Sequence, residues 1–198
     1  KWDGMRVLVE VRRGQVRAFS RNENDVTASF PDLAGLGQVV ADAVLDGEVV
    51  ALRSGAPSFS DLAERMHVRD ARRAASLMES NPVTLVLFDL LEHEGESLLD
   101  QSLTIRRERL ESFGLDDPAW LVPPAYDDGE LIHAAAQQRG LEGIVSKRRS
   151  SRYRPGVRSK DWLKFPIRPT GSFVIGGYRP ERESDRLGSV LVGLPDAD

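Results

Sequence analysis

The chain begins with a lysine that is followed by a carboxylate and a glycine, Lys1, Asp3 and Gly4. A lysine amine becomes a covalent nucleophile when nearby positive charge or loss of water keeps it neutral. The chain offers several cations that could do this, namely Arg6, Arg21, Lys147, Arg158 and Lys164. Taken alone, the tetrapeptide is explained more simply as a surface turn, so its chemistry depends on what accompanies it.

Three later segments combine apolar strand patterns with an aromatic, acidic or basic residue. They are Val83–Leu91, which contains Phe-Asp, Leu141–Lys147, which contains Glu-Gly, and Arg158–Phe165, which contains Trp-Leu-Lys. Each residue also has a simple structural explanation. Phe88 could be core, Glu48 in Leu-Asp-Gly-Glu could follow a turn into a strand, and Glu142, Arg158 and Lys164 could form surface ion pairs.

Positive charge is concentrated in one part of the chain. The whole chain has a net charge of −4, but residues 142–168 contain nine basic and two acidic residues, a local charge of +7. Such a stripe is typical of a surface that binds a phosphate chain or a nucleic-acid backbone. Considered alone, however, the stripe is explained better as a solvated charged face.

Composition excludes several classes of protein. The 198 residues are 40% hydrophobic and 29% charged, which predicts a folded chain with a real core. There is no cysteine, so disulfides, thiolate zinc sites and a cysteine nucleophile are excluded. The three histidines, His67, His93 and His133, are too scattered for a metal-ligand pattern. No apolar run is long enough to predict a membrane span or a signal peptide.

Strand and helix patterns interleave irregularly, which predicts an α+β fold with largely antiparallel sheets. The expected strands are 5–11, 16–20, 44–52, 83–91, 143–147, 162–167, 172–178 and 188–194. The expected helices are 33–43, 59–66, 71–79, 104–113 and 129–139. Four of these helices are preceded by capping residues, Ser58, Asp70, Ser102 and Asp128. The last two strands, joined by a turn-like segment over 179–186, predict the beginning of a second, all-β domain.

In their order and spacing, the motifs resemble those of the covalent nucleotidyltransferases: Lys-x-Asp-Gly-x-Arg, a Phe-Asp strand, Glu-Gly-x-x-x-Lys and Trp-Leu-Lys. The Trp-Leu-Lys ending, Phe-Asp-Leu-Leu and Ser20–Asp25 resemble the ATP-dependent DNA ligases in particular. Residues 173–178 and 187–191 further resemble the ligase module of bacterial multifunctional end-joining ligases. The resemblance covers residues 1 to about 194, and the ordered set is far more specific than any single motif.

The resemblance implies a role for each matching residue. Lys1 would attack the α-phosphate of ATP and hold AMP, which would pass to a DNA 5′-phosphate before a 3′-hydroxyl seals the nick. Phosphoryl transfer of this kind needs charge neutralisation and an in-line nucleophile. The nucleotide-binding residues implied are Arg6, Arg21, Glu48, Phe88, Arg158 and Lys164, with Phe88 on adenine and Glu48 and Arg6 on the ribose. Glu142 would hold Mg²⁺ or Mn²⁺, and Asp3, Gly4, Asp89 and Lys147 are further motif residues.

The resemblance also implies an architecture and a setting. Residues 1–168 would form a nucleotidyltransferase (ATP-grasp-like) adenylation domain, with antiparallel sheets flanked by helices and truncated at its N-terminus. Residues 169–198 would begin an OB-fold β-barrel. The implied partners are nicked double-stranded DNA and end-joining proteins that bind DNA ends. We expect a monomer without membrane attachment, in the bacterial cytoplasm at the nucleoid, acting in repair, recombination or replication of DNA.

The sequence departs from the family pattern at three points. Many relatives continue Trp-Leu-Lys with x-Lys, but here Pro166 takes that place and can donate neither charge nor a hydrogen bond, so Arg158 or Arg168 would supply the charge. The chain lacks the residue two positions before the lysine that helps recognise adenine, and the last motif beyond Asp198. These departures indicate an excised fragment whose α-amino group at Lys1 is artificial. We also expect Trp162 to pack internally, on the face opposite Lys164.

Two alternatives remain open. An RNA ligase or an RNA-capping guanylyltransferase of the same superfamily shares Lys-x-Asp-Gly and Glu-Gly, and choice of nucleotide and substrate separates these enzymes from a DNA ligase. A non-catalytic module that binds DNA ends is an alternative of a different class. It predicts binding that weakens steeply with salt and no transfer of label to Lys1.

Overall fold

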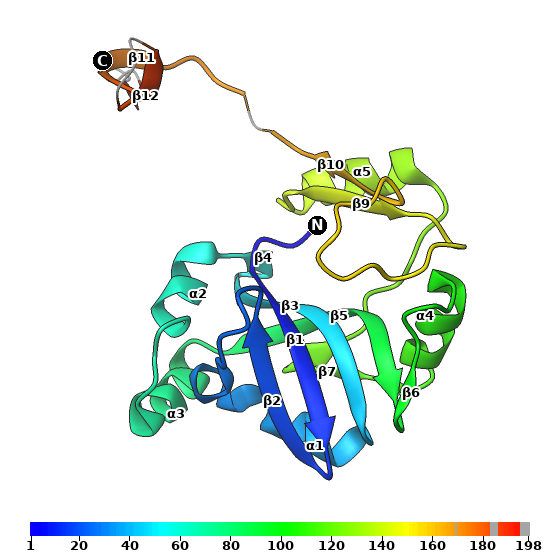
Figure 1. The fold of residues 1–198 in the computed structure, drawn as a ribbon. Coiled ribbons are helices and arrows are strands. Elements are labelled where there is room, and N and C mark those ends of the chain that lie inside the picture. The colour runs from blue at the N-terminus through cyan, green and yellow to red at the C-terminus, as the bar shows by residue number, and fades with distance from the viewer. Residues whose placement is uncertain (169, 183–185, 195–198) are drawn as a thin grey trace. The chain divides into compact units, whose positions relative to one another are not determined.

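The computed structural model describes residues 1–168, 170–182 and 186–194. The chain divides into two compact units, Lys1–Ile167 and Arg168–Asp198 (Figure 1). The first unit contains every candidate site residue. The second contains a single pair of strands in its described part, so each unit is treated by itself.

The first unit is built on one twisted sheet. Its central strands are β2 (Gln15–Ser20), β1 (Met5–Arg12), β3 (Ala43–Arg53) and β5 (Val83–His93), neighbours in that order. The short strands β8 (Trp120–Leu121) and β7 (Asp116–Asp117) continue the sheet, while β4 (Ala56–Pro57) pairs with β3 and β6 (Glu96–Ser97) with β5. All these pairs are antiparallel except β5–β8. The predicted α+β fold with largely antiparallel sheets is therefore confirmed.

The helices begin where the capping residues predicted. They are α2 (Phe59–Arg65), α3 (Ala71–Ser80), α4 (Leu103–Glu111) and α5 (Gly129–Gln138). Ser58, Asp70, Ser102 and Asp128 each accept a hydrogen bond from a backbone N–H of the first turn, which satisfies donors that a helix leaves unpaired.

The helix expected over 33–43 is wrong. Residues Thr27–Ser29 and Pro31–Gly35 form 3₁₀ turns, and α1 (Leu36–Val39) is only four residues long. Val40 is already extended, which suits a β-branched residue, and β3 starts at Ala43. Apolar residues at helical spacing thus belong to a short turn that packs under the sheet.

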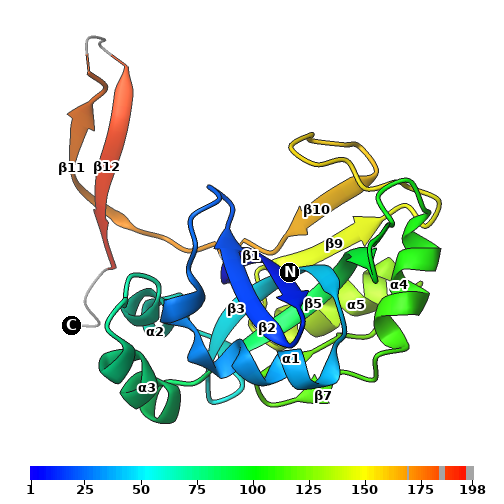
Figure 2. The same cartoon turned by 60° about the horizontal axis from the view of Figure 1, so that its bottom comes forward.

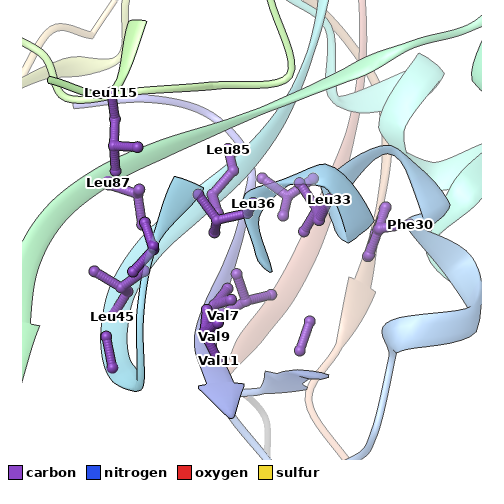
Figure 3. Packing of buried hydrophobic residues seen from close by; sticks show 14 of the residues in the cluster. Val7, Val9, Val11, Phe30, Leu33, Leu36, Leu45, Leu85, Leu87 and Leu115 are labelled. Carbon is purple, nitrogen blue, oxygen red and sulfur yellow. The ribbon is translucent and has the colours of Figure 1, made fainter. Parts of the chain in front are cut away.

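The core lies against one face of the sheet. Val7, Val9 and Val11 alternate along β1 onto this face, and they pack with Leu33 and Leu36 from the short turns (Figure 3). Leu45, Leu85, Leu87 and Leu90 complete the cluster from β3 and β5. Because side chains alternate, the intervening residues of β1, β3 and β5 point to the opposite face.

A β-bulge in β5 resets this alternation. Asp46 is opposite Asp89 and Gly47 is opposite Leu87, so Phe88 has no partner on β3. As a result Leu87 and Leu90, three residues apart, both enter the core, while Asp89 does not. The bulge therefore places Phe88 and Asp89 on the face away from the core.

A second, two-stranded sheet completes the first unit. It pairs β9 (Gly143–Lys147) with β10 (Trp162–Pro166) in antiparallel register and packs with α5. Figures 1 and 2 show the N-terminal end of the chain beside β9. The loop between β9 and β10 carries most of the basic stripe, and its backbone is hydrogen-bonded to α4 and to the turn after β6.

The second unit pairs β11 (Val174–Pro180) with β12 (Leu187–Gly193) in antiparallel register. Part of the expected turn, residues 183–185, lies outside the described residues, as do 169 and 195–198. The large apolar side chains in the described part of this unit are exposed. Across the described residues, no helix has the length and apolar character needed to cross a membrane.

Candidate active site

The site is built on the sheet face opposite the core. Arg6 on β1 is directly opposite Glu48 on β3, and Asp46 lies on the same face two residues before Glu48. The bulge adds Phe88 from β5, whose ring lies 5.9 Å from the Arg6 guanidinium carbon. The polar and aromatic residues that interrupt these apolar strands thus gather on one face.

The β9–β10 pair supplies the facing wall. Lys147 is directly opposite Trp162, and Val145 is directly opposite Lys164, so these four residues share one face of the pair. The expectation that Trp162 and Lys164 lie on opposite faces was wrong, because residues two apart on a strand point the same way. Pro166, which replaces the second lysine of the motif, lies opposite Gly143 on this same face.

Lys1 reaches the facing wall directly. Its Nζ forms an ion pair with Glu142, the residue immediately before β9. Gly4 brings the chain against β3 closely enough that an added Cβ would lie 2.3 Å from the Val49 carbonyl oxygen. Gly143 is under a similar constraint, since its φ is 137° and a Cβ there would meet the backbone of Phe165. The two glycines of the motifs therefore allow Lys1 and Glu142 to meet.

Arg6 is held in place by two partners. Its Nε and Nη2 donate to the two carboxylate oxygens of Asp46 at 2.9 and 2.6 Å, and Nη2 also donates to the Tyr153 hydroxyl at 2.9 Å. The Tyr153 hydroxyl in turn donates to Asp46 Oδ2 at 2.7 Å. The hydrogen bond to Asp46 raises the pKa of Arg6, and burial raises the pKa of Tyr153.

Glu48 is a half-buried carboxylate with no hydrogen-bond partner in the described part of the chain. Burial raises its pKa, and the positive charges of Lys1, Arg6 and Lys164 oppose that rise. Arg6 is directly opposite Glu48, and Lys1 and Lys164 are near enough for their charges to act on it. An acid in this environment can accept hydrogen bonds from the hydroxyl groups of a bound molecule.

Asp89 stabilises the fold and does not face the site. It is fully buried and forms a bidentate pair with Arg106 of α4, with Nε–Oδ1 at 2.7 Å and Nη2–Oδ2 at 3.0 Å. Arg106 also donates to the carbonyl oxygens of Gln101 and Ser151. Asp89 therefore fixes α4 and the loop between β9 and β10, and its side chain is buried where a ligand cannot contact it.

Lys147 is inserted between two aromatic rings. Its Nζ lies 3.7 Å from the centroid of Trp162 and 4.5 Å from that of Phe88, and donates to the Phe88 carbonyl oxygen at 3.4 Å. Burial lowers the pKa of Lys147 to about 8, although the negative charges of Asp89 and Asp46 oppose the shift. Trp162 is also edge-on to Phe88, at 6.3 Å between centroids.

Other expected site residues lie outside this cluster. Arg21 and Arg158 are exposed, and neither forms a hydrogen bond or ion pair with the described residues. Asp3 is half-buried and equally unpartnered there. Within the basic stripe, Arg148, Arg149 and Arg152 pair with aspartates. Five cations of the stripe remain exposed and without partners among the described residues: Arg154, Arg158, Lys160, Lys164 and Arg168.

Sequence reasoning missed three residues of the cluster. Asp46 and Tyr153 were not considered, and Trp162 was treated as packing only. The signals were a carboxylate within the buried strand β3 and a lone tyrosine among the arginines of the stripe. Neither signal indicates a partner, because the contact between Asp46 and Tyr153 joins residues that are 107 positions apart.

A lysine beside an acid, facing a cluster of basic, acidic and aromatic side chains across two sheets, has the parts of a covalent nucleotidyltransferase. The model of the ATP-dependent DNA ligase domain matches residues 1–165. The chain therefore belongs to the ATP-dependent DNA ligase domain family, and the resemblance inferred from the motifs is confirmed.

Individual relatives agree with this assignment. The multifunctional non-homologous end joining DNA repair protein LigD of Mycobacterium tuberculosis is 40% identical over 98% of this chain. DNA ligase 1 of Korarchaeum cryptofilum is 38% identical over 92% of it. The solved structure of mycobacterial DNA ligase D complexed with ATP and MES superposes with a TM-score of 0.73 at 38% identity, covering 99% of this chain and 61% of that one. The chain spans 25% of the length of that LigD protein and 34% of the archaeal ligase.

Proposed function

We propose that this chain carries out ATP-dependent DNA ligation and that Lys1 is the residue that takes up AMP. The observation that carries the proposal is the meeting of Lys1 and Glu142 beside a face that holds Arg6, Glu48 and Phe88. These residues come from four separate segments of the chain. Family membership supports ATP as the nucleotide.

Each part of ATP has a matching group in the cluster. Phe88 offers a ring on which adenine stacks, and Glu48 offers an unpartnered carboxylate to the ribose hydroxyls. Arg6 stands opposite Glu48 and contacts the same ribose. Lys164 on β10 lies near enough to Glu48 for their charges to interact, and it would neutralise phosphate charge. Arg158 and Arg21, outside the cluster, are exposed cations that would add to this neutralisation.

A divalent metal fits Glu142 as its single protein ligand. No group of three or more potential ligands that could hold a metal occurs among the described residues. Mg²⁺ binds nucleotides through one or two carboxylates together with phosphate oxygens, and Mn²⁺ accepts the same ligands. Glu142 is a partly exposed carboxylate beside Lys1, which suits this use. A bound metal would neutralise the phosphate charge that builds up during transfer.

The chemistry consists of three phosphoryl transfers. The Lys1 Nζ lone pair attacks the α-phosphorus, the bond to pyrophosphate breaks, and the nitrogen loses a proton. An oxygen of the DNA 5′-phosphate then attacks the same phosphorus, the P–N bond breaks and the amine regains its proton. Finally the 3′-hydroxyl attacks the activated 5′-phosphate, AMP leaves and the hydroxyl proton is released.

The exposed cations favour a phosphate backbone as the binding partner, and the DNA ligase family makes nicked double-stranded DNA the substrate that we propose. Arg154, Arg158, Lys160 and Lys164 are free to contact backbone phosphates, and such contacts make binding weaken as salt rises. LigD proteins are named for non-homologous end joining. We therefore propose action at DNA breaks in the bacterial nucleoid, as a monomer, together with proteins that bind DNA ends.

The test compares labelled ATP and GTP, then nicked DNA and nicked RNA. We use the chain as given and a form extended at both ends with the flanking residues of the mycobacterial relative. AMP transfer from ATP and sealing of nicked DNA are expected. Transfer from GTP would indicate a capping enzyme, and preferential sealing of RNA would indicate an RNA ligase. Salt-sensitive DNA binding without transfer in either form would indicate a binding module and overturn the proposal.

A further inference from the structure

We propose that Asp46 and Tyr153 are positioning residues that fix Arg6 for the nucleotide and attach the basic loop, residues 148–161, to the floor of the site. This inference rests on the proposed function. It concerns two residues that lie behind the ligand-facing groups, and its basis is a closed set of hydrogen bonds.

The three side chains form a ring in which each one contacts the other two. Arg6 donates to Asp46 through two nitrogens and to the Tyr153 hydroxyl at 2.9 Å, while that hydroxyl donates to Asp46 at 2.7 Å. Asp46 is completely buried, whereas the Arg6 side chain is 45% exposed. The anchor is thus inside the protein and the anchored cation faces outwards.

Within the described part of the chain, Arg6 keeps two of its N–H groups free to donate to a ligand. A guanidinium has five N–H groups. Nε and both N–H groups of Nη2 are used within the ring, whereas Nη1 has no acceptor among the described residues. The ring therefore limits Arg6 to one orientation, in which the two N–H groups of Nη1 are the ones that a ribose oxygen meets.

Tyr153 also ties the ring to the basic loop. Its backbone N–H donates to the Leu99 carbonyl oxygen at 2.9 Å, and its ring lies edge-on to Trp162, with 6.0 Å between centroids. Two residues earlier, the Ser151 carbonyl oxygen accepts hydrogen bonds from Arg106 and from the backbone of Leu103.

The loop is therefore fixed by two adjacent acids of the sheet. Asp46 holds it through Tyr153, and Asp89, the cross-strand partner of Asp46, holds it through Arg106. The exposed cations Arg154, Arg158 and Lys160 follow directly after Tyr153. The hydroxyl that orients Arg6 is therefore one of the contacts that set the placement of these cations.

The sharpest variant is Tyr153→Phe, because it keeps the ring contacts and removes only the hydroxyl. Arg6 then loses one acceptor and gains freedom to turn away from the ribose. We expect the KM for ATP in self-adenylation, and the Kd for ATP measured by calorimetry, to rise about tenfold, as for loss of a hydrogen bond to a charged group. We expect kcat to change less than about threefold, because Lys1 is untouched.

Two comparisons separate positioning from a general loss of structure. Tyr126→Phe is the matched control, since Tyr126 is 61% exposed and should leave all constants unchanged. In an Arg6→Ala background, Tyr153→Phe should have almost no further effect on the Kd, because the hydroxyl acts through Arg6. Equal effects in both backgrounds, or a fall in thermal stability and kcat with unchanged KM and Kd, would overturn the inference.

The results that would refute this inference differ from those that would refute the proposed function. A wild-type chain that takes label, with Tyr153→Phe unchanged, refutes only the positioning role. A wild-type chain that binds ATP without taking label refutes the covalent function, and the Kd values still decide on Tyr153. If neither form of the wild-type chain binds ATP, both proposals fail.

Discussion

Replacing Arg106 by methionine should destabilise the first unit strongly. Arg106 and Asp89 are both completely buried, and their two hydrogen bonds measure 2.7 and 3.0 Å. The substitution keeps an unbranched side chain but leaves a buried carboxylate without its counter-ion. It also removes a donor from the Gln101 and Ser151 carbonyl oxygens.

The magnitude follows from this burial. Removing one member of a buried ion pair costs about 3–5 kcal/mol, a large part of the roughly 5–15 kcal/mol that stabilises a typical domain. With a urea dependence of about 2 kcal/mol per molar, the unfolding midpoint should fall by about 2 M. The assay is urea unfolding followed by circular dichroism, which reports on the helices and the sheet of the first unit.

The matched control is Arg109→Met on the same helix. Arg109 pairs with Glu96 at 2.7 Å, but both side chains are largely exposed, so the cost should stay below about 1 kcal/mol. The double variant Asp89→Leu with Arg106→Met should regain part of the lost stability, because no lone charge stays buried. Equal costs for Arg106→Met and Arg109→Met, or a double variant that loses the sum of both single changes, would refute the reasoning.

Three further changes probe the site itself. Burial lowers the pKa of Lys147 to about 8, below the roughly 10.4 of an unfolded lysine, so the unfolded chain holds this proton more tightly. The unfolding free energy of the wild type, measured relative to Lys147→Met by urea titration at each pH, should therefore rise between pH 8 and pH 10; a flat difference would contradict this. Gly4→Ala places a Cβ 2.3 Å from the Val49 carbonyl oxygen. This change should lower the free energy of unfolding in urea by about 1–3 kcal/mol and slow AMP transfer at least tenfold. The control Gly129→Ala, where a Cβ meets nothing within 4 Å, should have neither effect. Pro166→Lys adds a cation on the face that bears Lys164 and should lower the KM for ATP several-fold at low salt, an effect that must shrink as salt is added.

The sequence predicted the strands and capped helices well because these depend on local patterns. Alternating valines specify the buried face of β1, and a single polar residue before each helix specifies where α2, α3, α4 and α5 begin. The prediction of a helix over residues 33–43 was wrong because the structure of this segment does not follow its local pattern. There the spacing of leucines suits a helix, but the backbone must turn early enough for β3 to enter the sheet.

The contacts of the site could be predicted only in part. The resemblance implied Lys1, Glu48, Phe88 and Glu142 as site residues, and in the structure Lys1 pairs with Glu142 beside the sheet face that bears Glu48 and Phe88. The bulge at Phe88 was not predictable, because it shows only in the register with β3. Nor were the partners of the two buried acids, since Asp46 meets Tyr153 and Asp89 meets Arg106 through packing of distant segments.

The identity of the labelled atom tests the central claim most directly. After incubation with ATP and a divalent metal, the extended protein is digested and the peptide that carries AMP is sequenced by mass spectrometry, alongside Lys1→Ala and Lys147→Ala. Our account predicts AMP on the Lys1 side chain, no label in Lys1→Ala and retained labelling in Lys147→Ala. Label on Lys147 or any other residue, or label that persists in Lys1→Ala, would contradict it.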